Sequence, residues 1–190
     1  GDFNADGMSD LAARTAFGQW WVGIAVTGDP GTYTTTSWGA WLDRDINAPS
    51  EPTTWEKLKV ADVNGDGKED IVAFDEASVT WRVALSTGTA FTSQETNWAA
   101  AYTWADPQIA DFNGDGRVDV AARVSLGQWW VGLSTETATG LQFSATAWEF
   151  WSDAGWHDVL TGDYNGDGKQ DILGRTATGQ WWLSQSNGSR

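Results

Sequence analysis

The stretch Asp111-Phe-Asn-Gly-Asp-Gly-Arg-Val-Asp119 decides the fold of this chain. It places oxygen-bearing side chains at its positions 1, 3, 5 and 9 and a glycine at position 6. Calcium prefers about six to eight oxygen ligands, and a short loop supplies them by curling around the ion, with a glycine at the sharp turn and a backbone carbonyl from position 7. The spacing therefore predicts a calcium-binding loop.

The same pattern of Asp, Asn, Asp, Gly and Asp occurs four times, beginning at residues 2, 62, 111 and 163, with Ala5 in the first copy where the others have glycine. Asp and Asn also favour turns that hold no ion, so a single copy would be weak evidence for a calcium site. Four copies with the same spacing favour calcium. We therefore expect up to four structural calcium ions. The expected ligands, with the residue at position 7 contributing its backbone carbonyl, are Asp2, Asn4, Asp6, Met8, Asp10, Asp62, Asn64, Asp66, Lys68, Asp70, Asp111, Asn113, Asp115, Arg117, Asp119, Asp163, Asn165, Asp167, Lys169 and Asp171.

The charge balance agrees with this reading. The chain has 190 residues, 26 of them acidic and 11 basic, for a net charge of −15. The loops hold 12 aspartates, three each, and four calcium ions would bring the net charge of −15 to about −7. The remaining negative charge argues against binding to nucleic acid and to anionic membranes, which both need a basic face.

The absence of cysteine excludes disulfides, zinc–thiolate sites and cysteine nucleophiles. Calcium loops can take the stapling role of disulfides, and they fill best outside the cell, where calcium is abundant. We therefore expect a secreted, extracellular or cell-surface protein. No apolar run approaches the ~20 residues of a membrane span. Because the chain opens inside a loop motif, we expect it to be a mature or excised piece of something longer.

The segments between the loops predict strands. Each loop is followed by a short apolar run, a polar turn and a second run, such as Gln128-Trp-Trp-Val-Gly-Leu133. Such runs, rich in β-branched and aromatic residues and bounded by turn residues, are typical of strands. No segment has the sustained apolar period of a helix, so we expect almost none.

The repeat spacing predicts an all-β fold, a β-propeller of four-stranded antiparallel blades, as a single domain over residues 1–190. In this scheme each loop joins the first strand of a blade to the second. The four repeats then hold three, four, four and three strands. Four blades in one ring, part of a larger ring, and completion by another chain or a second copy all remain open.

The Asp-x-Asn-Gly-Asp-Gly-x-x-Asp strings and their following apolar runs resemble FG-GAP, or VCBS-type, repeats. That family implies calcium-binding propeller blades, as in integrin heads and many secreted bacterial proteins. The resemblance covers all four repeats and carries over the loop ligands and the fold. It does not fix the partner, because the family binds proteins and glycans and also accompanies enzymes.

Tryptophan is abundant, with 15 residues. The adjacent pairs at 20–21, 129–130 and 181–182 point to opposite faces of a strand, and we expect them to pack between blades. A second set stands where the outer strand ends, near a rim, where we expect exposure. An exposed indole can cover the apolar face of a sugar while nearby polar groups bind its hydroxyls. The candidate sugar-binding residues are Trp38, Trp41, Trp148 and Trp151.

A recurring arginine, a recurring glutamine and the histidine are expected to have structural and not catalytic roles. Arginine recurs after the second strand, where we expect pairing with aspartate or stacking on an indole, at Arg14, Arg123 and Arg175. Glutamine precedes the tryptophan pairs, where we expect bonds to backbone, at Gln19, Gln128 and Gln180. His157 is the one histidine and has no counterpart in other repeats, so we expect no catalytic role for it.

These features predict an extracellular, calcium-stabilised binding module without catalytic activity. Carbohydrate is the first expected ligand class, which would make the chain lectin-like. Two alternatives stay open: an accessory or core domain of a secreted polysaccharide-degrading enzyme, and a structural or adhesive module that binds protein.

Overall fold

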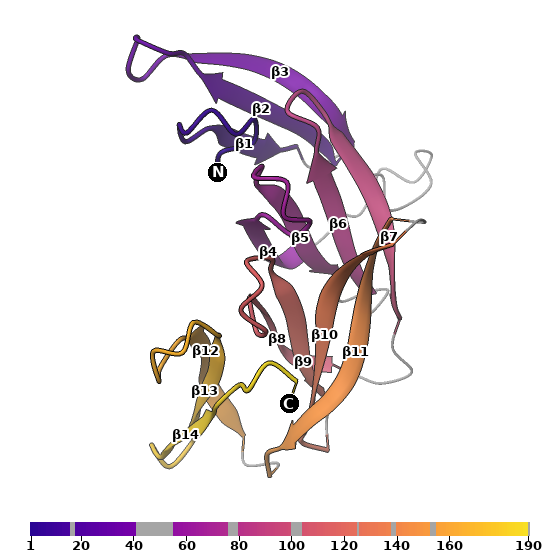
Figure 1. Cartoon of the computed structure of the whole chain (residues 1–190), viewed down its shortest axis with the longest axis vertical. Coiled ribbons are helices and arrows are strands. Elements are labelled where there is room, and N and C mark those ends of the chain that lie inside the picture. Colours follow the sequence, from indigo (N-terminus) through magenta and orange to yellow (C-terminus); the bar gives the residue numbers. More distant parts are fainter. Residues whose placement is uncertain are drawn as a thin grey trace. The chain divides into compact units, whose positions relative to one another are not determined.

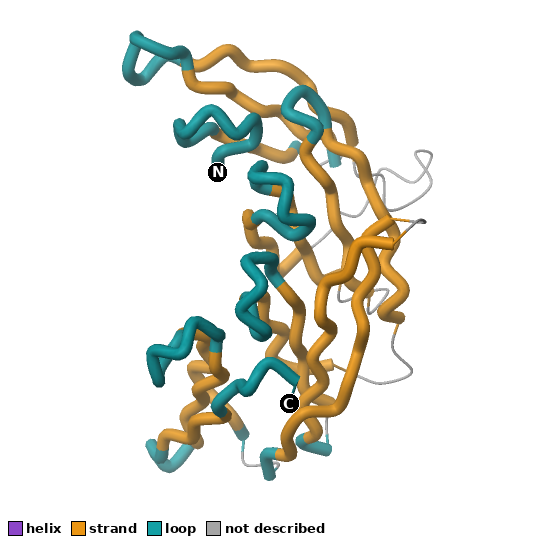
Figure 2. The backbone as a smooth tube through the Cα atoms, viewed as in Figure 1, coloured by secondary structure: helices purple, strands orange, loops and turns teal. Residues whose placement is uncertain are grey.

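The computed structural model describes residues 1–15, 18–40, 55–75, 80–99, 104–124, 126–137, 140–152 and 155–189. In these ranges the chain forms strands and turns, with no helix (Figure 2). None of the described residues therefore belongs to a helix long and apolar enough to cross a membrane. The expectation of an all-β chain is confirmed for this part of the chain.

The strands form four antiparallel sheets in chain order (Figure 1). Local hairpin connections of this kind are the commonest way to join antiparallel strands. Sheet 1 contains β1 (Leu11–Arg14), β2 (Gln19–Ala25) and β3 (Tyr33–Ala40). Sheet 2 contains β4 (Trp55–Ala61), β5 (Asp70–Asp75), β6 (Thr80–Ser86) and β7 (Phe91–Ala99). Sheet 3 contains β8 (Trp104–Ala110), β9 (Asp119–Val124), β10 (Gln128–Thr137) and β11 (Gly140–Phe150). Sheet 4 contains β12 (Trp156–Gly162), β13 (Asp171–Thr176) and β14 (Trp181–Ser184).

The nine-residue loops occupy matching places in these sheets. Residues 62–70 lead from β4 into β5, residues 111–119 from β8 into β9, and residues 163–171 from β12 into β13. Residues 2–10 lead into β1, and β14 is the last strand of sheet 4. The predicted succession of three, four, four and three strands is confirmed for the described residues.

The chain divides into two compact units. Unit 1 comprises Gly1–Glu76 and Arg82–Glu95, and unit 2 comprises Ala77–Trp81 and Thr96–Arg190. Unit 1 thus holds sheet 1 and most of sheet 2, whereas unit 2 holds sheets 3 and 4 and the remaining ends of sheet 2.

The core of each unit lies between two consecutive sheets. In unit 1 the buried residues of the core are Phe3, Trp20, Val22, Trp38, Ile71, Ala73 and Ala84. In unit 2 they are Ala110, Phe112, Ala121, Trp129, Val131, Trp151, Trp156 and Ile172. Each set draws on both sheets of its unit, so a single sheet buries its apolar side chains only against a neighbour.

Strand pairing identifies which face of each sheet is in the core of unit 2. Paired residues of an antiparallel ladder lie on the same face. Ala121 pairs with Val131, and we call their side of sheet 3 its A face. Ile172 pairs with Thr161, and we call their side of sheet 4 its B face. Because Val131 and Ile172 share one core, the A face of sheet 3 packs on the B face of sheet 4.

Unit 1 repeats this arrangement. Ala12 pairs with Val22 on the A face of sheet 1, and Val60 pairs with Ile71 on the B face of sheet 2. All four belong to, or pack against, the core of unit 1. The A face of one sheet therefore packs on the B face of the next in both units.

Two glycines allow tryptophan rings to approach the backbone. A Cβ atom at Gly132 in β10 would lie 2.6 Å from the Trp98 ring, and one at Gly174 in β13 would lie 2.6 Å from the Trp151 ring. Both glycines lack a positive φ, so space, and not backbone conformation, requires them. The indoles rest where any other residue would place a side chain.

Gly132→Ala should lower the free energy of unfolding by about 1–3 kcal/mol, the usual cost of overpacking a core. Gly23 holds the same place in the Gln-Trp-Trp-Val-Gly run of β2, but there the nearest atom to an added Cβ, the Tyr33 Cβ, lies 3.2 Å away. Gly23→Ala is therefore the matched control and should cost clearly less. Urea unfolding of the two variants measures the difference, and equal losses would contradict this account of Gly132.

Candidate functional site

In each nine-residue loop the aspartate at position 1 gathers backbone amides. At Asp111, Oδ1 accepts hydrogen bonds from the amides of Gly114 (2.7 Å) and Asp115 (3.2 Å), and Oδ2 accepts one from Gly116 (2.8 Å). The amides of positions 5 and 6 donate in the same way to the first aspartate of the other loops. In the first loop Ala5 adopts the left-handed region, with φ of 59°, where the others place glycine. All four loops therefore share one backbone conformation.

The aspartate at position 9 fastens the loop to its sheet. Asp119 has no exposed surface, and its carboxylate accepts hydrogen bonds from the amides of Phe112 (2.9 Å) and Ser134 in β10 (2.7 Å). Asp10, Asp70 and Asp171 are also buried and accept the equivalent pairs of amides. The aspartate at position 9 thus links the amide of position 2 in its own loop to an amide that lies in, or just after, the second strand beyond the loop.

Burial changes the acidity of two of these carboxyl groups. It raises the pKa of Asp70 to about 7 and that of Asp119 to about 7, because removal from water penalises the charged form. The two amide hydrogen bonds on each group act in the opposite direction, and the other aspartates of the same loop add to the rise. The buried carboxyl groups of Asp70 and Asp119 are therefore stabilised either by protonation or by a nearby cation.

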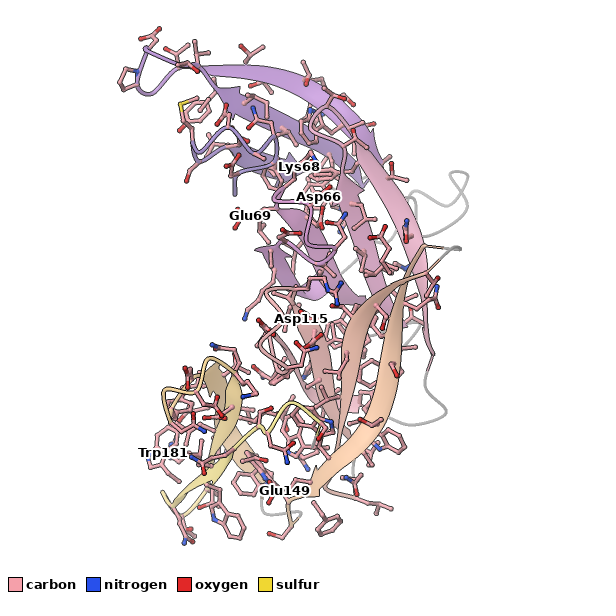
Figure 3. All side chains as sticks on the ribbon, in the orientation of Figure 1. Asp66, Lys68, Glu69, Asp115, Glu149 and Trp181 are labelled. Atoms are coloured by element: carbon pink, nitrogen blue, oxygen red, sulfur yellow. The ribbon has the colours of Figure 1, made fainter. Side chains whose placement is uncertain are left out.

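Basic side chains at position 7 pair with the aspartate at position 5. Lys68 Nζ lies 3.0 Å from Asp66 Oδ2, and the Arg117 guanidinium lies 2.7 Å from Asp115 Oδ2; Figure 3 shows the first pair. Partial burial acts to raise the pKa of these aspartates, but hydrogen bonds from the amide and side chain of position 7 outweigh it, so both pKa values lie below the ordinary one. Sequence reasoning gave position 7 only a carbonyl role, although the recurrence of Lys and Arg there was visible.

Two kinds of hydrogen bond join each loop to the next repeat within its unit. The Glu69 amide donates to the Asp2 carbonyl and the Gln170 amide to the Asp111 carbonyl, both at 2.8 Å. The Ser86 hydroxyl donates to the Phe3 carbonyl, and the Ser186 hydroxyl to the Phe112 carbonyl. Sequence reasoning missed both serines. The signal was a serine placed 15 or 16 residues after the last loop aspartate.

The arginine predictions are confirmed in two repeats. The guanidinium of Arg123 lies 2.8 Å from Asp106, and that of Arg175 lies 2.6 Å from Asp158. Arg175 also lies over the Trp181 ring, 6.0 Å from its centroid. The prediction for glutamine is confirmed as well: the side-chain amides donate to backbone carbonyls at Gln19 and Gln128.

The expected exposure of the second tryptophan set is wrong for two of its members. Trp38 is 2% exposed and Trp151 is 1% exposed. Phe91 of the following sheet packs edge-on against Trp38, with ring centroids 5.1 Å apart, and Trp156 of the following sheet lies 4.5 Å from Trp151. Both indoles are therefore core residues that join sheets. Trp41 lies outside the described residues.

Trp148 differs from Trp38 although the two occupy equivalent places. Each donates its indole N–H to a threonine two residues earlier, at 3.0 Å, and each meets the aromatic ring at position 2 of its own loop. Trp148 is nevertheless only half-buried. The reason is that sheet 4 ends at β14 and provides no equivalent of β7, whose Phe91 covers Trp38.

The tryptophan pairs behave less uniformly than expected. Trp20 and Trp129 are buried between sheets, as predicted, but Trp21 is 44% exposed. Trp181 and Trp182 in β14 are 50% and 42% exposed. Position within the array of sheets, and not the local sequence, decides which rings are covered.

The raised pKa values predict how pH affects the free energy of unfolding of the metal-free chain, kept so by excess chelator. A carboxyl group whose pKa is higher in the folded chain holds more protons there, so it stabilises the fold below its unfolded pKa and loses this effect as pH rises through its folded pKa. For Asp70 and Asp119 that window runs from the ordinary value of 3.8 to about 7.

The free energy of unfolding should therefore decrease between about pH 4 and pH 7, and urea unfolding across this range measures it. Asp66 and Asp115 have lowered pKa values, so their effect on the free energy of unfolding is confined to pH values below this range. The double variant Asp70→Asn, Asp119→Asn should flatten the slope. A free energy of unfolding that rises with pH in the parent chain would refute the prediction.

The sequence and the fold were compared with those of known proteins. Residues 62–122 match the family model described as an FG-GAP-like repeat. A similar solved structure is that of a lectin from Agrocybe aegerita that recognises non-reducing terminal N-acetylglucosamine, with a TM-score of 0.64 and 22% identity over 99% of this chain and 51% of the lectin chain. This chain thus spans about half the length of that lectin chain and shares its fold. No curated protein matches the sequence. For residues 62–122 this match confirms the resemblance noted from the loops.

Proposed function

We propose that this chain is an extracellular, calcium-stabilised β-propeller module that binds carbohydrate and does not catalyse a reaction. The half-exposed indole of Trp148, fixed next to polar side chains on a lectin-like fold, carries the proposal for the ligand. The four equivalent loops carry the proposal for the metal. The sheets are the blades of the propeller.

The loops offer the hard oxygen donors that calcium prefers. In the third loop these are Asp111, Asn113, Asp115 and Asp119 and the carbonyl of Arg117. Among the described residues no three Asp, Glu or His side chains are gathered closely enough to hold a metal by themselves. The proposal therefore requires the Asn113 amide oxygen and the Arg117 carbonyl as further ligands. The amide hydrogen bonds are compatible with this role, because a carboxylate has about four lone-pair sites.

Calcium would also relieve repulsion among the three aspartates of each loop. Removing it with excess chelator should lower the melting temperature, and adding calcium back should restore it. One site filled a hundredfold above its dissociation constant contributes about 2.7 kcal/mol. Asp115→Asn should weaken calcium binding in calorimetric titrations, whereas Asp29→Asn, at an exposed aspartate outside the loops, should not. A melting temperature unaffected by chelator would rule out calcium in the loops.

The surface next to Trp148 has the chemistry for a sugar. An indole covers the apolar C–H face of a pyranose, and polar groups at its edge bind the hydroxyls. Trp148 is anchored by Thr146, its neighbour Glu149 is exposed, and the Glu149 carboxylate accepts a hydrogen bond from the Ser184 hydroxyl of β14. Figure 3 shows Glu149 on β11. All of these groups belong to unit 2.

Trp148→Ala should abolish binding of N-acetylglucosamine-terminated oligosaccharides, measured by tryptophan fluorescence and on a glycan array. Thr146→Val keeps the indole but removes its anchor, and should weaken binding less. Leu126→Ala changes a 77% exposed apolar side chain on another turn and should leave binding unchanged. No binding to any glycan by the parent chain would refute the carbohydrate proposal, and unchanged binding in Trp148→Ala would refute the site.

A further inference from the structure

A chain of buried hydrogen bonds joins the two loops of unit 2. The carboxylate of Asp171, at position 9 of the last loop, accepts a hydrogen bond from the Ser186 amide at 2.8 Å. The Ser186 hydroxyl donates to the Phe112 carbonyl at 2.6 Å, and Figure 1 shows the segment after β14 returning towards sheet 3. The Phe112 amide then donates to Asp119, at position 9 of the third loop, at 2.9 Å. We call this chain the serine relay of unit 2.

Unit 1 contains the same relay between its own two loops. The carboxylate of Asp70 accepts the Ser86 amide at 2.7 Å, and the Ser86 hydroxyl donates to the Phe3 carbonyl at 2.5 Å. The Phe3 amide donates to Asp10 at 2.9 Å. The residues of both relays are at most 4% exposed. Because water cannot replace a lost partner in such places, breaking a relay is more costly than breaking a surface hydrogen bond.

Each relay begins and ends on a carboxylate of a proposed calcium site. Asp119 and Asp171 hold position 9 in consecutive loops of unit 2, as Asp10 and Asp70 do in unit 1. A carboxylate has about four lone-pair sites, so it can accept amide hydrogen bonds and bind a cation at the same time. A cation in one loop would therefore act on a carboxylate that the relay connects to the other loop.

A shorter link joins the same loops through backbone atoms alone. The Gln170 amide, at position 8 of the last loop, donates to the carbonyl of Asp111, at position 1 of the third loop, at 2.8 Å. In unit 1 the Glu69 amide donates to the Asp2 carbonyl, also at 2.8 Å. The first and last ligand positions of one loop are thus both tied to the loop that follows it.

We propose that calcium binds cooperatively to the two loops of each unit, and that the serine relay carries most of the coupling. Calcium in the loops is itself part of the proposed function, on which this coupling rests. An ion in the last loop holds Asp171 in place and, through the relay, orders Asp119 before the second ion arrives. The second ion then has fewer groups to order, so it binds more tightly.

Repulsion between the two ions acts against this coupling. A filled loop holds two additional positive charges, which disfavour a second divalent cation nearby. Salt and solvent weaken this repulsion at exposed loops. The relay and the repulsion have opposite effects on the second binding constant, so the direction of the measured change shows which of them prevails.

Emptying one loop tests the coupling at the other. Asp167→Asn removes a ligand at position 5 of the last loop, outside the relay. Amide NMR spectra follow calcium binding loop by loop at the position 6 glycines, whose amides bond the first aspartate of their own loops. Binding read at Gly116 should weaken about fivefold, the lower end of usual coupling between sites. By reciprocity, Asp115→Asn should weaken binding read at Gly168 by the same factor.

A matched substitution and the second unit provide the controls. Asp158→Asn removes a carboxylate from sheet 4 outside its loop, at a φ of 49° that asparagine tolerates. It should leave the calcium titration at Gly116 unchanged. Asp66→Asn in the second loop repeats the experiment in unit 1, where binding read at Gly7 should weaken.

Substitution of the relay serine tests the route. Ser186→Ala removes the hydroxyl but keeps the amide and every expected calcium ligand. In this background the effect of Asp167→Asn at Gly116 should fall to about twofold or less, a double-mutant cycle in which only the backbone link remains. Ser134→Ala is the matched control, because Ser134 is 2% exposed and its hydroxyl has no hydrogen-bond partner among the described residues. It should leave the coupling undiminished.

The possible failures give different results. Glycine amides that do not respond to calcium in the parent chain would refute the calcium sites and the coupling together. Calcium that fills the loops while Asp167→Asn leaves binding at Gly116 unchanged, or strengthens it, would refute the coupling alone. The spectrum also shows whether Ser186→Ala is folded, and Ser86→Ala, read at Gly7, decides if it is not. Undiminished coupling in the folded serine variants would show that the relay does not carry it.

Discussion

The buried aspartate that ends each nine-residue loop is the constraint on which the rest of the structure depends. Asp70 and Asp119 each accept two backbone amides and have no contact with water. A carboxylate without such bonds would be too costly to bury. By holding the amide of position 2, the aspartate also fixes the carbonyl of the same residue. At Phe112 this carbonyl accepts a hydrogen bond from the hydroxyl of Ser186, just after β14. Loop geometry thereby determines how one sheet meets the next.

Packing between sheets supplies the stability that no single sheet has. Trp129 on the A face of sheet 3 is buried by Trp151 and Trp156, which lie between sheets 3 and 4. Trp129 meets Trp151 edge-on and Trp151 meets Trp156 at a tilt, and aromatic contacts of this kind add about 0.5–1.5 kcal/mol each beyond the burial of area. Gly174 permits Trp151 to rest directly on the backbone of β13. The abundance of tryptophan is thus largely an internal feature of the fold.

Regular features of the sequence predicted the regular features of the structure. The loop spacing around Asp119, the apolar runs after each loop and the strand succession all depend on local sequence, and the structure has them as expected. The burial of Trp38 could not be predicted in this way. It depends on Phe91, which lies 53 residues later in the chain and belongs to another sheet. The serine bridges escaped notice for the same reason, since Ser186 and Phe112 are 74 residues apart.

A repeat sequence specifies each sheet as though a neighbour were present on both faces. Leu11, Leu183 and Tyr164 hold positions that are apolar in the other repeats as well. At the equivalent positions of sheets 2 and 3 and their loops, Ile71, Val83 and Phe112 have no exposed surface. Leu11, Leu183 and Tyr164 are 56%, 43% and 45% exposed, so the same local sequence leads to burial only where a neighbouring sheet lies against it.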